Sequence, residues 1–265
     1  MVKKVVALDI GGTNIRCGLV FGKRILSLSR AKTPKTKREF LNLITSMIAE
    51  KIGPDVSGIG VGFPSPIKNS SVTTKAPNLP IQNFPLADYL KKKFRKKVLV
   101  KNDASCVALA EAKLGERKKN LLVMTLGTGI GGGIIINGEE YSGGGLGAEF
   151  GFMLINGRYL EDSWKETKRK MGGLLMSEVM VKHPKKAERL FCEVGDYLGQ
   201  AIASLINIFS PDAFVLTGGP RECGRRLLLP IQRGVKKYQF IPKKVPIIWS
   251  SLSEPGLLGA GLLIK

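Results

Sequence analysis

The sequence predicts an α/β protein of two related lobes, and three observations lead to this prediction. Strand patterns alternate with helical patterns along the 265 residues. A unit of strand, glycine turn and returning antiparallel strand begins at Val5 and begins again at Leu121. Such an internal recurrence indicates two related lobes that face each other. The chain length also lies between that of one large domain and two small ones.

The first lobe opens with the strand Val5–Ile10, whose residues are apolar except for Asp9. A tight turn at Gly22-Lys23 then predicts a hairpin. Helical spacing of apolar residues predicts the next helix, and a strand rich in glycine follows, whose missing side chains allow another segment to approach the backbone. The elements after the first strand are Cys17–Phe21, Arg24–Ser29, helix Lys37–Ile52, strand Gly58–Pro64, loop Ser65–Pro85, strand Val98–Asp103 and helix Ala104–Leu114.

The second lobe repeats the strand and the glycine turn and then contains the strongest helical pattern of the chain. One stripe of this helix is apolar, and Ser210-Pro211 ends it. A third glycine turn follows the next strand. The predicted elements are strand Leu121–Leu126, glycine turn Gly127–Gly133, return strand Ile134–Asn137, helix Lys185–Phe209, strand Ala213–Thr217, glycine turn Gly218–Pro220, strand Val245–Ser250 and helix Gly256–Lys265.

The charge of the chain is strongly positive, with 42 Lys and Arg residues against 21 Asp and Glu residues, a net charge of +21. Such a field attracts polyanions, from nucleic acid and anionic membrane to polyphosphate and phosphorylated metabolites. Lys91–Lys97 is its densest block, and either a solvated helix end or a polyanion site explains it.

Targeting segments and cysteine pairs are not evident in the sequence. No stretch reaches the roughly 20 apolar residues of a membrane span, and the N-terminus has no signal-peptide pattern, so we expect a cytoplasmic protein without membrane contact. The four cysteines are far apart in sequence and form no CxxC pair, so no structural zinc is expected. Cys17, Cys106 and Cys192 stand in apolar or helical surroundings, which predicts reduced packing residues.

The turn after the first strand has the composition of a phosphate-binding loop. Gly11 and Gly12 allow an anion to approach backbone N–H groups, and Thr13 and Asn14 add side-chain donors. Asp9 stands at the tip of the same strand, where a carboxylate can hold Mg²⁺ through water against the phosphates of a nucleotide. A plain hairpin turn is the alternative.

The other two glycine turns offer related chemistry. The turn in "LGTGIGGG" has the same donors without the acid, and Thr128 can hydrogen-bond a phosphoryl oxygen, although a hairpin without ligand has the same pattern. The turn in "LTGG" could let an adenine and ribose lie on Gly218 and Gly219.

Asn102 and Asp103 end a strand of the first lobe and precede a helix. A carboxylate at this place can accept the proton of a hydroxyl that attacks phosphorus, a general-base role worth roughly 10²–10⁴ in rate. The alternative is that Asp103 caps the helix beginning at Ala104.

Together these stretches resemble the ROK family of sugar kinases and repressors, within the actin-like ATPase superfamily. The resemblance covers nearly the whole chain, because the motifs stand in the family's order. They are "DIGGTN", "VGFPSPI", "APNL", "KNDASCVALAEAKLG", "LGTGIGGG", "GLGAEFG", "LINIFSPDAFVLTGG" and "GLLGAGLLI". The resemblance implies a two-lobed actin-like (ribonuclease H-like) fold with an active-site cleft between domains. We expect residues 1–112 and 253–265 in one lobe and 113–252 in the other.

The resemblance also implies roles for individual residues. Asp103 matches the catalytic base, and Asp9 would orient Mg²⁺. Phosphate would contact Gly11, Gly12, Thr13 and Asn14 from one lobe and Thr128 and Gly129 to Gly131 from the other, and Gly218 and Gly219 would line the nucleoside pocket. Sugar hydroxyls would bind Asn102, Glu149 and Glu161, with Asn78 a weaker candidate.

Two departures from the family pattern concern metal and sugar. A His usually follows the "EFG" motif, and here the position is Phe152, which removes a sugar contact and leaves the sugar's identity open. The zinc loop of the family is reduced to Asn156–Glu161 without Cys or His, so no zinc is predicted, and Glu161 is assigned across a deletion. The lone histidine, His183, lies away from every motif and is expected at the surface.

Three functions follow from these observations. The leading one is ATP-dependent phosphorylation of a hexose or N-acetylhexosamine, with glucose at C6 foremost and ATP and Mg²⁺ as cofactors. The second keeps the enzyme and uses polyphosphate as donor, which the positive charge would suit. The third is a sugar-responsive transcription regulator, disfavoured because the phosphate strand begins at Val5 without a DNA-binding domain before it. We expect no specific nucleic-acid partner, and the family analogy suggests a homodimer.

Overall fold

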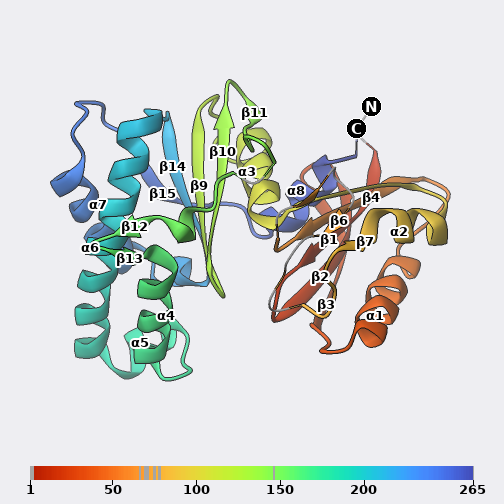
Figure 1. Cartoon of the computed structure of the whole chain (residues 1–265), viewed down its shortest axis with the longest axis horizontal. Coiled ribbons are helices and arrows are strands. Elements are labelled where there is room, and N and C mark those ends of the chain that lie inside the picture. Colours follow the sequence, from red (N-terminus) through yellow and green to blue (C-terminus); the bar gives the residue numbers. More distant parts are fainter. Residues whose placement is uncertain are drawn as a thin grey trace. The chain divides into compact units, whose positions relative to one another are not determined.

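Figure 1 shows a computed structural model of the chain, which describes residues 3–65, 67–68, 72–73, 76, 79–145 and 147–264. The chain forms two compact units. Unit 1 contains Met1–Gly115, Glu140–Gly147 and Leu252–Lys265, and unit 2 contains Glu116–Glu139 and Ala148–Ser251. The return of Glu140–Gly147 to unit 1 was not anticipated in the sequence. The carboxylate of Glu140, 8% exposed, pairs there with the ammonium of Lys101.

Unit 1 is built on a mixed five-stranded sheet. Its strands are β1 (Lys4–Ile10), β2 (Asn14–Phe21), β3 (Arg24–Lys32), β4 (Val56–Phe63) and β8 (Lys97–Asn102), in the order β3-β2-β1-β4-β8. Strand β2 is antiparallel to β1 and β3, whereas β4 is parallel to β1 and β8. A small second sheet joins β5 (Ile67–Lys68), β6 (Val72–Thr73) and β7 (Phe84–Pro85).

Alternate residues of β1 enter two different hydrophobic clusters, as the period of a strand requires. Val6, Leu8 and Ile10 pack with α1 (Lys37–Ala49) and α2 (Leu86–Phe94). Ala7 packs with α3 (Asp103–Lys113) and α8 (Pro255–Leu262). Asp9 has the parity of Ala7, and this places its side chain on the α3/α8 face of the sheet.

Helix α8 lies directly on its neighbours because its packing residues are glycine and alanine. A Cβ built on Gly259 would stand 1.7 Å from the carbonyl oxygen of Cys106 in α3. A Cβ on Gly60 of β4 would stand 1.9 Å from the carbonyl oxygen of Ala260. The glycine-rich strand therefore does admit a close neighbour, as its composition predicted, and that neighbour is α8.

Unit 2 repeats the mixed sheet and covers it with longer helices. Its strands are β9 (Leu121–Leu126), β10 (Ile130–Ile136), β11 (Glu139–Glu140), β14 (Ala213–Gly218) and β15 (Ile247–Trp249), in the order β11-β10-β9-β14-β15. As in unit 1, the first strand is antiparallel to its hairpin partner β10 and parallel to β14.

Helices, two 3₁₀ turns and a short hairpin complete unit 2. They are η1 (Phe150–Phe152), β12 (Leu154–Ile155), β13 (Arg158–Tyr159), α4 (Leu160–Met171), α5 (Met176–Lys182), α6 (Pro184–Phe209), η2 (Gly219–Cys223) and α7 (Arg225–Tyr238). The large cluster of unit 2 contains residues from all four helices and from the sheet. Among the described helices, none has both the length and the apolar character needed to cross a membrane.

Several predicted boundaries are wrong, and each has a local reason. The helix predicted over Lys37–Ile52 ends at Ala49, and the terminal helix predicted to Lys265 ends at Leu262. The predicted loop Ser65–Pro85 contains β5, β6 and β7, too short for a periodic signal. Helices α2, α4, α5 and α7 were not predicted; α2 and α5 are short, and α4 and α7 carry many charges on their exposed faces. The strongest prediction, helix Lys185–Phe209, is confirmed, because α6 begins one residue earlier, at Pro184, and ends at Phe209.

The basic block Lys91–Lys97 spans the end of α2 and the start of β8. Lys91, Lys92 and Lys93 are exposed on the last turn of the helix. Arg95 then ends the helix in the left-handed conformation, and Lys96 donates to the carbonyl of Val56 at 2.6 Å. Three lysines of the block are thus exposed at a helix end, which fits both readings, and Lys96 is tied to the backbone of unit 1.

Candidate active site

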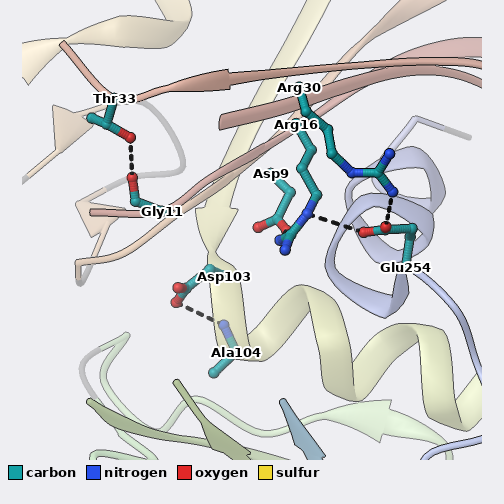
Figure 2. Close-up of polar contacts among 8 residues, drawn as sticks. All are labelled: Asp9, Gly11, Arg16, Arg30, Thr33, Asp103, Ala104 and Glu254. Atoms are coloured by element: carbon teal, nitrogen blue, oxygen red, sulfur yellow. Dashed lines mark hydrogen bonds and ion pairs between the residues drawn. The ribbon is translucent and has the colours of Figure 1, made fainter. Parts of the chain in front are cut away.

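The carboxylate of Asp9 is held by an arginine on the neighbouring strand. Asp9 and Arg16 are paired in the β1/β2 register, and Arg16 Nη1 lies 2.9 Å from Asp9 Oδ2. Arg16 also reaches Glu254 through Nε at 3.2 Å, and Arg30 holds the same glutamate at 2.6 Å. Figure 2 shows this chain of alternating charges. The Asp9 side chain is 16% exposed, and burial raises its pKa although Arg16 opposes the shift.

The turn after β1 is closed by hydrogen bonds within unit 1. The N–H of Gly11 donates to the carbonyl of Asn14 at 2.9 Å. The hydroxyl of Thr33 donates to the carbonyl of Gly11 at 2.7 Å, as Figure 2 shows, and the N–H of Thr33 donates to Thr13 at 2.9 Å. A Cβ on Gly11 would lie 3.0 Å from the Asn14 oxygen, which explains a glycine at this position.

The junction of β8 and α3 corrects the capping alternative. Asn102, and not Asp103, is the N-cap, because its side-chain oxygen accepts the N–H of Ser105 at 3.1 Å. Asp103 is the first helical residue, and its Oδ1 accepts the N–H of Ala104 at 2.8 Å (Figure 2). Asp103 is therefore placed at the N-terminal end of α3 without being its capping residue.

Asp9 and Asp103 come together across Gly62 of β4. Asp9 is in register with Gly62, and a Cβ on Gly62 would lie 3.6 Å from the Cα of Asp103. The charges of both carboxylates affect the pKa of the nearby Cys106 thiol. Its pKa is raised chiefly by burial and further by the charges of Asp103 and Asp9. Unit 1 therefore collects two carboxylates on the α3/α8 face of its sheet.

In unit 2 the second glycine turn is shorter than predicted. Strand β10 already begins at Ile130, so the turn comprises residues 127–129. We call this turn the phosphate loop, after the role proposed for it below. The N–H of Gly131 donates to the hydroxyl of Thr125 at 3.2 Å and belongs to the hairpin. Gly132 has a packing role, because its Cβ would stand 2.3 Å from the carbonyl oxygen of Ala148.

Helix α4 holds the phosphate loop from one side. Glu161 Oε2 accepts the N–H of Ile130 at 2.7 Å, and Trp164 Nε1 donates to the carbonyl of Gly127 at 3.0 Å. The ammonium of Lys168 donates to the carbonyl of Thr128. Trp164 and Lys168 were missed in the sequence, where nothing but their helical spacing from Glu161 could have indicated them.

Glu161 also lies against the segment that carries Glu149. A Cβ on Gly151, two residues beyond Glu149, would stand 3.3 Å from Glu161 Oε2. A Cβ on Gly129 would stand 2.8 Å from Glu161 Oε1. One carboxylate thus contacts both the phosphate loop and the "EFG" segment. Phe152 of that segment is 62% exposed, with its ring against Tyr159.

The third glycine turn lies beside the phosphate loop in the same sheet. Gly218 ends β14 in register with Leu126, the last residue of β9. Its φ of 113° and a Cβ that would stand 2.0 Å from the Leu126 carbonyl oxygen require glycine here for structural reasons. A Cβ on Gly219 would meet nothing within 4 Å. The backbone of Gly219 therefore remains approachable, as a nucleoside would require.

The remaining predictions concern Asn78, metal binding and the cysteines. Asn78 lies outside the described residues. No group of three or more His, Cys, Asp or Glu side chains suited to a metal ion occurs in the part of the chain that the structure describes. The absence of zinc remains a prediction. Cys17 and Cys106 are buried free thiols, as predicted, and Cys223 is buried as well. The prediction for Cys192 is wrong, because this residue is exposed on α6.

The model of the ROK family matches residues 5–158 and 153–265, together nearly the whole chain. The chain belongs to the ROK family. A glucokinase of Thermotoga maritima is 28% identical to this ROK protein, and the alignment covers 99% of the chain and 97% of the relative.

Solved ROK structures share the fold over almost the full length. A glucokinase from Streptomyces griseus, in complex with glucose and AMPPNP, has a TM-score of 0.85 at 27% identity. The match covers 98% of this chain and 99% of the glucokinase chain. An inorganic polyphosphate/ATP-glucomannokinase from Arthrobacter has a TM-score of 0.74 at 27% identity. This match covers 99% of the present chain and 98% of the glucomannokinase chain. This ROK protein is accordingly a sugar kinase of the glucokinase and hexokinase kind.

Proposed function

We propose that this ROK-family kinase transfers the γ-phosphoryl group of ATP to a sugar hydroxyl, foremost the C6 hydroxyl of glucose, with Asp103 as general base. The observation that carries the proposal is the position of Asp103 at the start of α3, across Gly62 from Asp9. A carboxylate so placed can take the hydroxyl proton while the phosphoryl group is accepted. The Streptomyces griseus relative, with glucose and AMPPNP bound, supports both substrates.

Asp9 fits the role of a metal positioner. Mg²⁺ prefers oxygen ligands, keeps several waters and needs one or two carboxylates, and Asp9 supplies one such group beside the turn Gly11–Asn14. Its pairing with Arg16 favours contact through water over direct coordination. When bound, the ion would supply positive charge against the oxygens of the transferred phosphoryl group.

Each unit, taken by itself, has backbone and side-chain donors that suit the phosphates of a nucleotide. We assign phosphate to Gly12, Thr13 and Asn14 in unit 1 and to Thr128 and Gly129 in unit 2, with Gly219 under the nucleoside. The hydrogen bonds and packing of Gly11, Gly131 and Gly218 show that these residues shape the loops, so their contribution would come through backbone geometry.

The sugar would be bound by Asn102, Glu149 and Glu161, with Asn78 as a further candidate. Asn102 already uses its oxygen as a helix cap, and its Nδ2 lies 3.5 Å from the carbonyl of Ser65. The exposed phenyl ring of Phe152 cannot hydrogen-bond a sugar hydroxyl, so the sugar must be identified by experiment.

A screen of acceptors tests the proposal. The purified protein is incubated with ATP, Mg²⁺ and each of a set of hexoses and N-acetylhexosamines, and ADP release is measured. We expect turnover with glucose at the highest kcat/KM, because the Thermotoga and Streptomyces relatives are glucokinases. No turnover with any sugar would overturn the proposal.

Polyphosphate is a second candidate donor, favoured by two observations. The net charge of +21 would attract it, and the Arthrobacter relative is described as using inorganic polyphosphate as well as ATP. Replacing ATP by polyphosphate in the same screen decides between the donors. A kcat/KM for polyphosphate above that for ATP would make polyphosphate the main donor.

The charge chain at Asp9 predicts a pH effect. Arg16 lowers the pKa of Asp9 against the effect of burial, so Arg16→Met is expected to raise that pKa further. If activity requires ionised Asp9, the acid limb of the pH profile will lie at a higher pH in Arg16→Met than in the wild type. The pH profile of kcat/KM for ATP measures this acid limb.

Arg30→Met is the matched control for this change. Arg30 pairs with Glu254 and makes no described contact with Asp9, so its removal should move the acid limb less. Equal acid limbs in the wild type and in Arg16→Met would contradict the requirement for ionised Asp9.

A further inference from the structure

Three side chains of α4 hold backbone groups of the phosphate loop and of Ile130, the residue that follows it. Glu161, Trp164 and Lys168 are spaced by three and four residues, which places them on one face of the helix. They contact the N–H of Ile130, the carbonyl of Gly127 and the carbonyl of Thr128. All these contacts lie within unit 2 and join elements about 30 residues apart or more, so they are tertiary interactions.

The two carbonyl contacts determine where the next N–H groups point. In a trans peptide the carbonyl of one residue and the N–H of the following residue point in opposite directions. Trp164 holds the Gly127 carbonyl toward α4, so the N–H of Thr128 faces away from the helix. Lys168 holds the Thr128 carbonyl, so the N–H of Gly129 also faces away.

These two N–H groups are the ones a phosphate could use. Thr128 is exposed and Gly129 is half-buried, whereas the N–H groups of Ile130 and Gly131 donate to Glu161 and Thr125. The indole of Trp164 is 2% exposed and thus fixed by packing as well as by its hydrogen bond. The ammonium of Lys168 contacts the carbonyl end of the peptide between Thr128 and Gly129. This positive charge polarises the peptide, whose N–H end would face the anion.

We propose that Trp164 and Lys168 are positioning residues that orient the N–H groups of Thr128 and Gly129 toward the phosphates of the donor. The inference rests on the proposed use of ATP and deepens it, because it names the residues that keep the phosphate loop ready. They act on the nucleotide side of the reaction and leave the sugar side unchanged.

Two substitutions test the inference. Trp164→Phe removes the N–H donor and keeps an aromatic ring, and Lys168→Met removes the ammonium and keeps the aliphatic stem. Each is expected to weaken binding of AMPPNP roughly three- to tenfold, the range of one lost hydrogen bond. Affinity is measured by titration calorimetry without sugar, and KM for ATP should rise by a similar factor while KM for the sugar stays within about twofold.

Control variants separate positioning from stability. Arg169→Met makes the same charge change on an exposed neighbouring position of α4, and Lys168→Arg restores a donor, so both should bind AMPPNP like the wild type. Lys168 is partly exposed, and its replacement tests the inference even if Trp164→Phe folds poorly. Melting temperatures of all variants are recorded beside the affinities.

The outcomes distinguish the inference from the proposed function. Wild-type affinity for AMPPNP in both variants, with or without a lower melting temperature, would overturn the positioning role alone. Binding of AMPPNP without turnover of any sugar would overturn the sugar-kinase proposal alone. A wild-type protein that binds no AMPPNP would overturn both.

Discussion

Replacing Asp103 by Asn is expected to lower kcat for phosphoryl transfer by roughly 10²–10⁴, the usual contribution of a general base. The amide cannot take up the proton of the attacking hydroxyl. It can still accept the N–H of Ala104, the bond that Oδ1 of Asp103 makes at 2.8 Å, so α3 should keep its first turn. Initial rates with saturating ATP and the best sugar of the screen measure the effect.

Binding measurements show whether this loss is chemical. Calorimetric affinities of Asp103→Asn for the sugar and for AMPPNP should stay within about threefold of the wild type, since an interaction made only in the transition state affects kcat. Asp88→Asn, an exposed aspartate of α2, serves as the control and should be fully active. Turnover of Asp103→Asn near the wild-type rate would refute the assignment of the base.

Replacing Gly259 by Ala is expected to lower the free energy of unfolding by roughly 3 kcal/mol, the upper end of the usual cost of overpacking. The added Cβ would stand 1.7 Å from the carbonyl oxygen of Cys106, and backbone cannot yield as the end of a flexible side chain can. Helix α8 or α3 must therefore shift. Differential scanning calorimetry and urea unfolding measure the loss.

A matched glycine provides the comparison. A Cβ on Gly144 would meet nothing within 4 Å, so Gly144→Ala should leave the melting temperature unchanged or raise it slightly. Because α3 begins at Asp103 and Gly256 of α8 packs against Asp9, the Gly259 variant should also lose activity. Equal unfolding curves for Gly259→Ala and the wild type would show that the α3/α8 contact is softer than the structure indicates.

Much of the fold could be predicted because its strongest signals are local. Apolar runs ending in glycine turns located β1, β9 and β14, and a long apolar stripe located α6. The recurrence of strand, turn and strand predicted two related lobes, and the two five-stranded sheets do share the same central pairing of strands. Helices α4 and α7 are rich in charge and were missed, although buried residues recur at helical spacing on one face of each.

The candidate site shows the same division. Motifs in the sequence indicated Asp9, Asp103 and the glycine turns as candidates, and their assignment to the site stays a prediction. The sequence could not assign the cap to Asn102, which depends on the backbone path into α3. It also could not assign Gly218 and Gly132 to packing, since the atoms that exclude a Cβ there belong to other segments.

The sequence by itself determined that this protein has two α/β lobes with glycine turns, a carboxylate at the first turn and an Asn-Asp pair at a helix start. Only the tertiary structure decided which groups hold these parts in place. Arg16 and Glu254 at Asp9, and Trp164 and Lys168 at the phosphate loop, are brought there by register and by helix packing. Residues distant in sequence meet through such contacts, and no local pattern of residue types records them.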